Sequence, residues 1–161
     1  MGEESLHPIA AEALVAFAPD TRGVPPLSLR GGNALDDYQA PPAFDCVADK
    51  LTDEYLENYH WGIAYLDPAS FRHYLPHLIE YALRRTEAGS NVVDALLNGL
   101  RPPDREPPRL ASFSSGQEVV IVKFLDALAF SDGSAHTELA SQVLEEWWAP
   151  GALYRPAAND A

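Results

Sequence analysis

Two histidines and a glutamate lie at a spacing that could bind a metal ion. His73, His77 and Glu80 stand at i, i+4 and i+7 in the segment FRHYLPHLIEYALRR. On a helix this spacing brings all three side chains to one face, and two imidazoles with a carboxylate suit zinc or iron. Pro76 lies between the histidines and disturbs this geometry. The segment also lacks the glutamate that follows the first histidine of H-E-x-x-H zinc proteases.

Other patterns typical of catalysis are missing from the sequence. It contains neither a G-x-S-x-G nucleophile motif nor a glycine-rich phosphate-binding motif of the G-x-x-x-x-G-K-[ST] or G-x-G-x-x-G type. Cys46, the only cysteine, lies in the acidic run FDCVAD, where neighbouring carboxylates raise rather than lower a thiol pKa. We therefore expect no cofactor, and we keep a metal-dependent enzyme built on His73, His77 and Glu80 as the second hypothesis.

The charge of the chain restricts the class of partner. The 161 residues carry a formal net charge of −13. Nucleic acids and anionic membranes would repel such a surface, so neither is expected as a partner, whereas a basic protein would complement it. A single cysteine and an acidic N-terminus without a basic, apolar leader indicate a cytoplasmic protein.

Two aromatic residues lie among acids in one part of the chain. The run DDYQAPPAFD is followed by the first turn of a predicted helix that begins with two further acids. Aromatic side chains supply buried anchors in protein interfaces, and surrounding acids steer a basic partner. We therefore predict a partner-binding surface formed by Asp36, Asp37, Tyr38, Phe44, Asp53 and Glu54.

Local signals predict where most helices begin. Thr52 can cap a short helix that ends near Tyr59, and Asp67 followed by Pro68 can begin the central helix. Seven apolar or aromatic residues of that helix fall on one face, and its histidines fall on the other. Pro76 should kink the central helix or split it near Tyr74.

Further helices are predicted on both sides of this region. A first helix follows Pro8, another follows Ser90 or Asn91, and Ser114 with Gln117 forms a capping box. We assign GQEVVIVKFLDALAF to a helix rather than a strand because its apolar residues keep the helical period. The last helix runs from about residue 135 to 148, where two adjacent tryptophans cannot both lie centrally in one core face.

These predictions describe an all-α domain of about six helices over residues 1–150, with a poorly ordered tail at 151–161. A long segment rich in proline and glycine follows the first helix, over about residues 18–47, and has no clear period. It is either a binding loop or an extended strap on the core. The run RPPDREPPR predicts an exposed, polyproline-like connector.

The central residues resemble those of a widespread, functionally uncharacterised family of small, mostly bacterial proteins. The resemblance runs from about Leu51 to Trp148 and includes the pattern Pro-x-x-Phe-Arg-x-Tyr-Leu-Pro, which here begins at Pro68. The family implies a helical fold and offers no catalytic residue. Its recurring arginine corresponds to Arg72, for which we predict an ion pair with an acid such as Asp53 or Glu54.

Our first hypothesis is a non-enzymatic, protein-binding function. The expected form is an acidic immunity or antitoxin-like protein that neutralises a basic bacterial toxin. The alternatives are the metal-dependent enzyme, an adaptor or structural domain, and a mimic of nucleic acid. The sequence does not indicate the oligomeric state.

Overall fold

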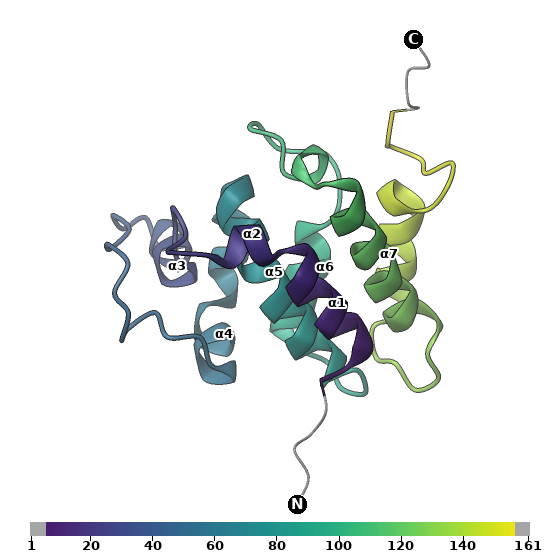
Figure 1. The fold of residues 1–161 in the computed structure, drawn as a ribbon, viewed down its shortest axis with the longest axis horizontal. Helices are drawn as coiled ribbons and strands as arrows, with labels where there is room; N and C mark the ends of the chain where they lie inside the picture. Colours follow the sequence, from purple (N-terminus) through teal and green to yellow (C-terminus); the bar gives the residue numbers. More distant parts are fainter. Residues whose placement is uncertain (1–5, 157–161) are drawn as a thin grey trace, which may run out of the picture.

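Helix α5 (Pro68–Leu83) lies at the centre of the structure, and the other helices pack around it (Figure 1). The computed structural model describes residues 6–156, and over that range it contains helices and loops but no strand. The remaining α-helices are α1 (Pro8–Ala16), α2 (Ala18–Thr21), α3 (Leu29–Asp36), α4 (Asp53–Tyr59), α6 (Asn91–Gly99), α7 (Ser115–Phe130) and α8 (Thr137–Val143). Shorter helical turns are η1 (His60–Tyr65), η2 (Leu110–Ser112) and η3 (Leu144–Trp148). The predicted all-α single domain is confirmed, with more helices than expected.

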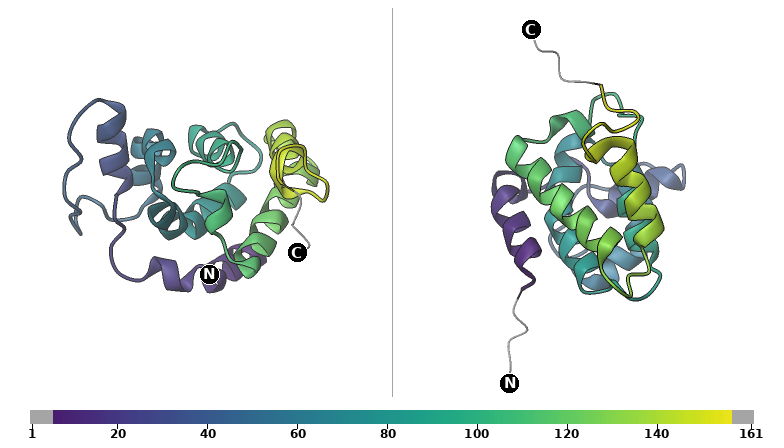
Figure 2. Two further views of the ribbon diagram at one scale, coloured as in Figure 1. Left: turned by 90° about the horizontal axis from the view of Figure 1, so that it is seen from above. Right: turned by 90° about the vertical axis from the view of Figure 1, so that its right-hand side faces the viewer.

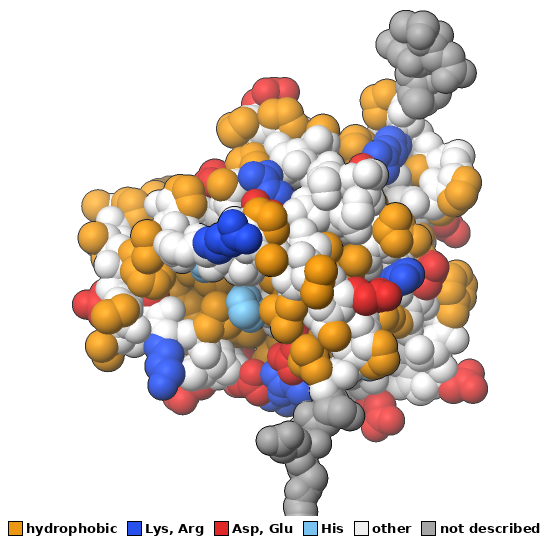
Figure 3. All heavy atoms as spheres, viewed as in Figure 1, with side chains coloured by type: hydrophobic (Ala, Val, Ile, Leu, Met, Phe, Trp, Pro, Cys, Tyr) orange, Lys and Arg blue, Asp and Glu red, His pale blue; other side chains and the backbone are white. Residues whose placement is uncertain are grey.

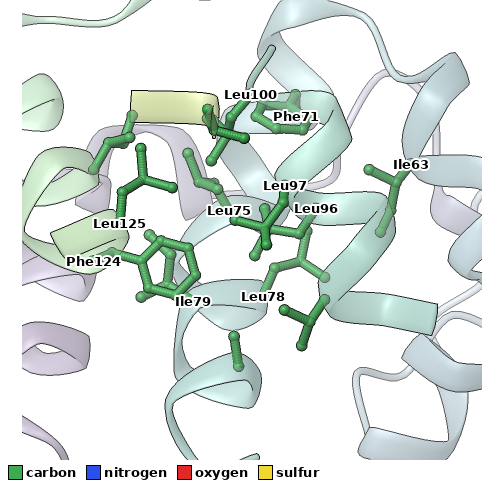
Figure 4. Close-up of a cluster of buried hydrophobic side chains, with 14 of the residues drawn as sticks. Ile63, Phe71, Leu75, Leu78, Ile79, Leu96, Leu97, Leu100, Phe124 and Leu125 are labelled. Carbon is green, nitrogen blue, oxygen red and sulfur yellow. The ribbon is translucent and has the colours of Figure 1, made fainter. Parts of the chain in front are cut away.

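The core is built between α5, α6 and α7. Figure 4 shows apolar side chains of these three helices converging on one another, and their exposed fractions are zero. They include Leu75, Leu78, Ile79, Leu96, Leu97, Phe124 and Leu125. Helices α3 and α8 lie at two different ends of the molecule (Figure 2), and both extend the core, α3 through Leu29 and α8 through Ala140 and Val143.

The central helix has the predicted start and the predicted buried face. Asp67 accepts a hydrogen bond from the Ser70 amide, and Pro68 occupies the first helical position. Pro76 does not split the helix, which runs through it without interruption. The apolar face of α5 packs on both sides of Pro76, and this burial offsets the loss of one backbone hydrogen bond.

The predicted ion pair of Arg72 with Asp53 or Glu54 is wrong. Arg72 Nε lies 3.0 Å from Asp20 Oδ1, and its Nη1 lies 2.6 Å from Ser112 Oγ. Asp20 belongs to α2, in the segment that the sequence left without a helix. The arginine therefore joins α5 to α2 and η2 instead of α5 to α4.

The capping predictions are confirmed at three further helices. Thr52, Ser90 and Ser114 each accept a hydrogen bond from a backbone amide three residues later. Ser114 and Gln117 form the full capping box, because the Gln117 side chain also accepts from the Ser114 amide at 3.0 Å. The VVIV run lies within helix α7, as predicted.

Ser114→Ala is expected to lower the free energy of unfolding by about 1 kcal/mol, because it removes the acceptor of the Gln117 amide. Urea unfolding measures the change, with an unaltered slope against denaturant. Ser115→Ala is the matched control, since Ser115 is exposed and next in the chain. Equal effects of the two substitutions would contradict a specific role for the capping box.

Residues 18–47 are more ordered than the sequence suggested. Helices α2 and α3 both lie within this segment, and Ser28 caps α3 through a 2.8 Å hydrogen bond to the Gly31 amide. The two glycines of α3 conceal its helical character, because glycine has a low helix propensity. Two irregular parts remain, residues 22–28 between α2 and α3 and the loop after α3.

The connector between α6 and η2 is not exposed along its whole length. Arg109 is only 3% exposed, and its Nη2 donates to the carbonyl oxygens of Ile63 at 3.2 Å and Leu66 at 2.6 Å. Its guanidinium also lies 4.2 Å from the centre of the Phe71 ring. Burial lowers the pKa of Arg109 to about 10. The prediction that the connector is exposed is therefore wrong at Arg109. This residue binds the connector to the end of η1.

The C-terminal helix ends in a π-turn that buries both tryptophans. Trp147 and Trp148 are 8% and 5% exposed, and Trp148 Nε1 donates to the Leu100 carbonyl at 2.9 Å. Arg155 covers both indole rings. The predicted poorly ordered tail falls partly outside the described residues, at 157–161. Over residues 6–156, the structure has no helix whose length and apolar character would let it cross a membrane.

Candidate functional site

The structure separates the six predicted partner-binding residues into two groups. Asp36, Asp37, Tyr38 and Phe44 lie at the end of α3 and in the following loop, whereas Asp53 and Glu54 lie in the first turn of α4. Glu54 is exposed. Four of the six residues thus belong to the end of α3 and the loop after it, and two belong to α4.

The Asp53 carboxylate already forms ion pairs within the protein. Its two carboxylate oxygens bind Arg84 at 2.7 and 3.0 Å, and Arg85 lies 2.7 Å from one of them. These guanidinium groups, Arg84 first, hold the pKa of Asp53 below its usual value. Asp53 thus fastens α4 to the end of α5 and is a poor choice for a partner contact.

The loop of residues 37–48, called here the acidic loop, is exposed at every position. Tyr38 is 97% exposed, Val47 81% and Phe44 37%, so the loop displays two aromatic side chains and one aliphatic side chain to solvent. Cys46 is exposed beside them as a free thiol. Large apolar side chains gathered on one surface segment are typical of interaction sites.

Tyr38 has an uncommon backbone conformation. Its φ is +59°, a left-handed value that is uncommon for residues other than glycine. It follows the last turn of α3, where the Gln39 amide donates to the Ala34 carbonyl at 2.8 Å. Because bulky residues adopt this conformation at a cost of about 1 kcal/mol or more, surrounding hydrogen bonds must hold it.

A buried ion pair fixes the far end of the acidic loop. The Asp49 side chain is fully buried, and its two oxygens lie 3.0 and 2.9 Å from Nε and Nη2 of Arg30 on α3. Tyr55 of α4 donates its hydroxyl to Asp49 at 2.8 Å. Burial alone would raise the pKa of Asp49, but the hydrogen bonds from Arg30, the Asp45 amide and Tyr55 outweigh it and lower the pKa.

The same network reaches into the loop itself. Arg30 Nη2 donates to the Ala43 carbonyl at 3.2 Å, and the Asp45 amide donates to Asp49 at 2.8 Å. Asp45 in turn accepts from the amides of Val47 and Ala48 at 2.8 and 2.9 Å. The side chains of the acidic loop are therefore displayed on a backbone that is hydrogen-bonded at several points.

Three carboxylates accompany the exposed apolar side chains. Asp37 and Asp45 lie in the loop and are exposed, and Asp36 precedes it at the end of α3. Asp36 accepts a hydrogen bond from the Tyr65 hydroxyl at 3.0 Å, which orients its carboxylate. Backbone amides of Ala48 and Val47 keep the pKa of Asp45 low, so it is ionised at neutral pH.

The predicted metal ligands lie on the half-buried side of α5. His73 Nδ1 is 3.1 Å from the Asp20 carbonyl, and Glu80 binds Arg84 through two hydrogen bonds. Burial lowers the pKa of both His73 and His77, and in His77 the neighbouring His73 contributes further. Among residues 6–156, no group of three histidine, cysteine or acidic side chains is arranged to hold a metal ion.

A polar cavity of about 750 Å³ opens at the C-terminal end of α5. Its charged groups interact with one another: the Tyr81 hydroxyl donates to Glu57 at 2.6 Å, and Arg85 lies 4.6 Å from the centre of the Tyr81 ring. These contacts occupy Tyr81 and Glu57, whereas His60 Nε2 and Arg85 Nε, which belong to other lining residues, have no hydrogen-bond partner among residues 6–156. We choose the acidic loop as the candidate site because it displays large apolar side chains on a hydrogen-bonded backbone.

Sequence reasoning found the exposed aromatics but missed the groups that position them. Neither Arg30 nor Asp49 belonged to a recognised motif, and they lie 19 residues apart. The only available signal was Arg30 itself, a lone base just before the acidic stretch. Val47 was missed because the segment around it showed no period.

The comparisons with known proteins identify a family and no function. A family model described as "Family of unknown function (DUF6714)" matches residues 6–152. No curated protein and no solved structure matches the chain. The match begins well before Leu51, so it includes α1, α2, α3 and the acidic loop.

Proposed function

The chain belongs to this family of unknown function, as expected from its central residues, and from that premise we propose that it is a protein-binding protein whose acidic loop captures a basic protein. The partner class that its charge favours is a basic bacterial toxin, which the chain would neutralise as an immunity protein. The display of Tyr38, Phe44 and Val47 on an anchored loop is the observation that supports this proposal.

The exposed side chains have the chemistry of interface anchors. Tyrosine and phenylalanine bury large areas on binding and are frequent among residues that dominate interface energies. Tyr38 projects almost wholly into solvent, so a pocket on a partner could enclose it from several sides. Phe44 and Val47 extend the contact along the same loop.

The hydrogen-bonded backbone reduces the cost of binding. A flexible loop loses conformational entropy when a partner fixes it, and this loss weakens the complex. Here Asp49, Asp45 and Arg30 already hold the loop. The free protein therefore presents its anchors close to the arrangement that a partner would meet.

Charge determines the kind of partner. Asp36, Asp37 and Asp45 surround the anchors, and the whole chain carries a net charge of −13. Opposite charge accelerates association and disfavours acidic competitors. A basic surface with an apolar pocket is the complement of the acidic loop.

Replacing Tyr38 and Phe44 together by alanine is expected to weaken partner binding by at least about thirtyfold, equivalent to about 2 kcal/mol, because both anchors are lost. The partner is first captured with the purified chain at low and at high salt, with the product of the neighbouring gene included. Its affinity is then measured by titration calorimetry. Trp61→Ala, which removes an exposed aromatic from η1, is the control and should leave the affinity unchanged.

Charge reversal tests the acidic part of the proposal. Asp36→Lys with Asp37→Lys should slow association at low salt and have little effect at high salt. Asp132→Lys with Glu138→Lys changes the net charge equally at exposed positions of another surface. If both pairs slowed association to the same extent, net charge rather than the acidic loop would be responsible, and the proposal would fail in this form.

A further inference from the structure

Helix α1 is apolar on all sides although it lies at the surface. Its residues are PIAAEALVA, in which Glu12 is the only charged side chain. Ala10 and Ala13 are buried against the core, whereas Val15 is 78% exposed and Leu14 also faces solvent. Helices without a polar side are normally covered on all sides.

Helix α7 continues this apolar surface. Gln117 Nε2 donates to the Ala16 carbonyl at 3.1 Å, and further along α7 Lys123 binds Glu12 at 3.1 Å, so the two helices run antiparallel and side by side (Figure 2). Val119 and Phe130 of α7 are 55% and 74% exposed. Figure 3 shows hydrophobic side chains gathered over both helices.

The charge of this surface differs from that of the acidic loop. Glu12 and Lys123 neutralise one another, and both remain about half exposed. Asp126 adds one exposed carboxylate on α7, and Glu118 is paired with Arg155. In a chain with a net charge of −13, a nearly neutral apolar surface is where two copies can meet with little repulsion.

We propose that this surface, the α1–α7 face formed by Val15, Val119 and Phe130 around the Glu12–Lys123 pair, binds the α1–α7 face of a second copy of the chain. The pair is complementary to itself under a twofold axis, because Glu12 of each copy can face Lys123 of the other. The acidic loop could not serve this role, since two copies would bring its carboxylates together. The proposal does not depend on the function of that loop.

The size of the face sets the strength of the dimer. Sixteen residues of α7 and nine of α1 give lengths of about 24 and 14 Å, and each helix is about 10 Å wide, so the face covers on the order of 400 Å². Stable interfaces bury about 800 Å² on each partner. The dimer therefore forms and dissociates with concentration and is not permanent.

Sedimentation velocity of the full chain, over about 10 µM to 1 mM, tests the proposal. The expected result is a sedimentation coefficient that rises from the monomer toward the dimer value. Val119→Asp should weaken dimerisation at least about tenfold, because it places a carboxylate in the middle of each apolar face. Val47→Asp makes the same change at an exposed valine of the acidic loop and should have no effect.

The charge pair gives a second test. Lys123→Glu should weaken the dimer, because it places like charges in both copies, and adding Glu12→Lys should restore it by exchanging the two charges. Circular dichroism melting confirms that each variant is folded. A monomer at every concentration, or equal loss of the dimer in Val119→Asp and Val47→Asp, would overturn the proposal.

Discussion

Gly62→Ala is expected to destabilise the protein by about 3 kcal/mol, the largest effect of any single methyl group that we predict. The backbone of Gly62 in η1 lies against the backbone of α3. A Cβ added at Gly62 would meet the Leu29 carbonyl oxygen and would stand 2.8 Å from the Asn33 amide. Both neighbours are main-chain atoms, which cannot move aside as the end of a side chain can.

We make the same prediction for Gly32, which lies on the α3 side of this contact. A Cβ at Gly32 would lie 2.5 Å from the Gly62 carbonyl oxygen, so Gly32→Ala should also force α3 away from η1. Because α3 carries Arg30, its displacement should also disturb the acidic loop. Thermal and urea unfolding measure the loss of stability, and partner binding measures the effect on the loop.

Gly116→Ala is the control for these substitutions. Gly116 lies in the first turn of α7, and an added Cβ would meet nothing within 4 Å. Since alanine favours helix by up to about 1 kcal/mol over glycine, this variant should be as stable as the natural chain or more so. A Gly62→Ala variant of unchanged stability would show that α3 and η1 are not in close contact.

Asp49→Asn is expected to cost about 3 kcal/mol of folding free energy, because it removes the carboxylate that pairs with Arg30. The asparagine side chain would keep the shape of the aspartate and lose its charge. Its NH₂ group would face the hydrogen-bond donors of Arg30, Tyr55 and the Asp45 amide. Arg30 is about one-fifth exposed and can reach some water, which limits the loss. Exposed Asp37→Asn is the matched control and should change stability by less than about 0.5 kcal/mol.

The pH dependence of this effect has a definite sign. The folded-state pKa of Asp49 is lowered, so its contribution to stability is complete above the unfolded-state pKa of about 3.9 and is lost as the pH falls through the folded-state pKa. The stability difference between the natural chain and Asp49→Asn should therefore be constant near neutral pH and shrink in acid. A difference that grew as the pH fell would contradict the assignment.

The Asp49 substitution also tests how the acidic loop works. It leaves Tyr38, Phe44 and Val47 in place and removes the group that anchors the loop. Affinity for the partner should fall although the three side chains proposed to contact it are unchanged. Unchanged affinity in a folded variant would mean that the loop does not need to be held before it binds.

The parts of the fold that sequence reasoning predicted depend on neighbouring residues. Thr52, Asp67, Ser90 and Ser114 each act on an amide three residues away, so the information lies within one turn of chain. The buried face of α5 follows from the helical period of its apolar residues. Assigning α7 to a helix succeeded for the same reason.

The parts that were missed depend on contacts between distant residues. Arg72 was paired with an acid of α4, Asp53 or Glu54, but it binds Asp20, 52 residues earlier. Helix α3 contains Gly32 because the backbone of Gly62 in η1 packs closely on it, a reason that propensity alone cannot reveal.

Part of the candidate site could be proposed from composition. Tyr38 and Phe44 lie among acids in the sequence, and both side chains are exposed in the structure. Asp53 was named for its charge, but its pairing with Arg84 and Arg85 could not be foreseen from spacing. The anchoring role of Asp49 needed the fold, because Arg30 approaches it only when α3 is in place.

The antiparallel pair of α1 and α7 has a consequence for how the chain is made. Gln117, which binds the end of α1, follows Ala16 by 101 residues. A ribosome that adds about 5–20 residues per second needs about 5–20 s to synthesise this interval. During this interval α1 can pack on α5, which is synthesised earlier, but it has no α7 beside it. The side of α1 that faces α7 should therefore stay uncovered on the nascent chain until α7 has been made.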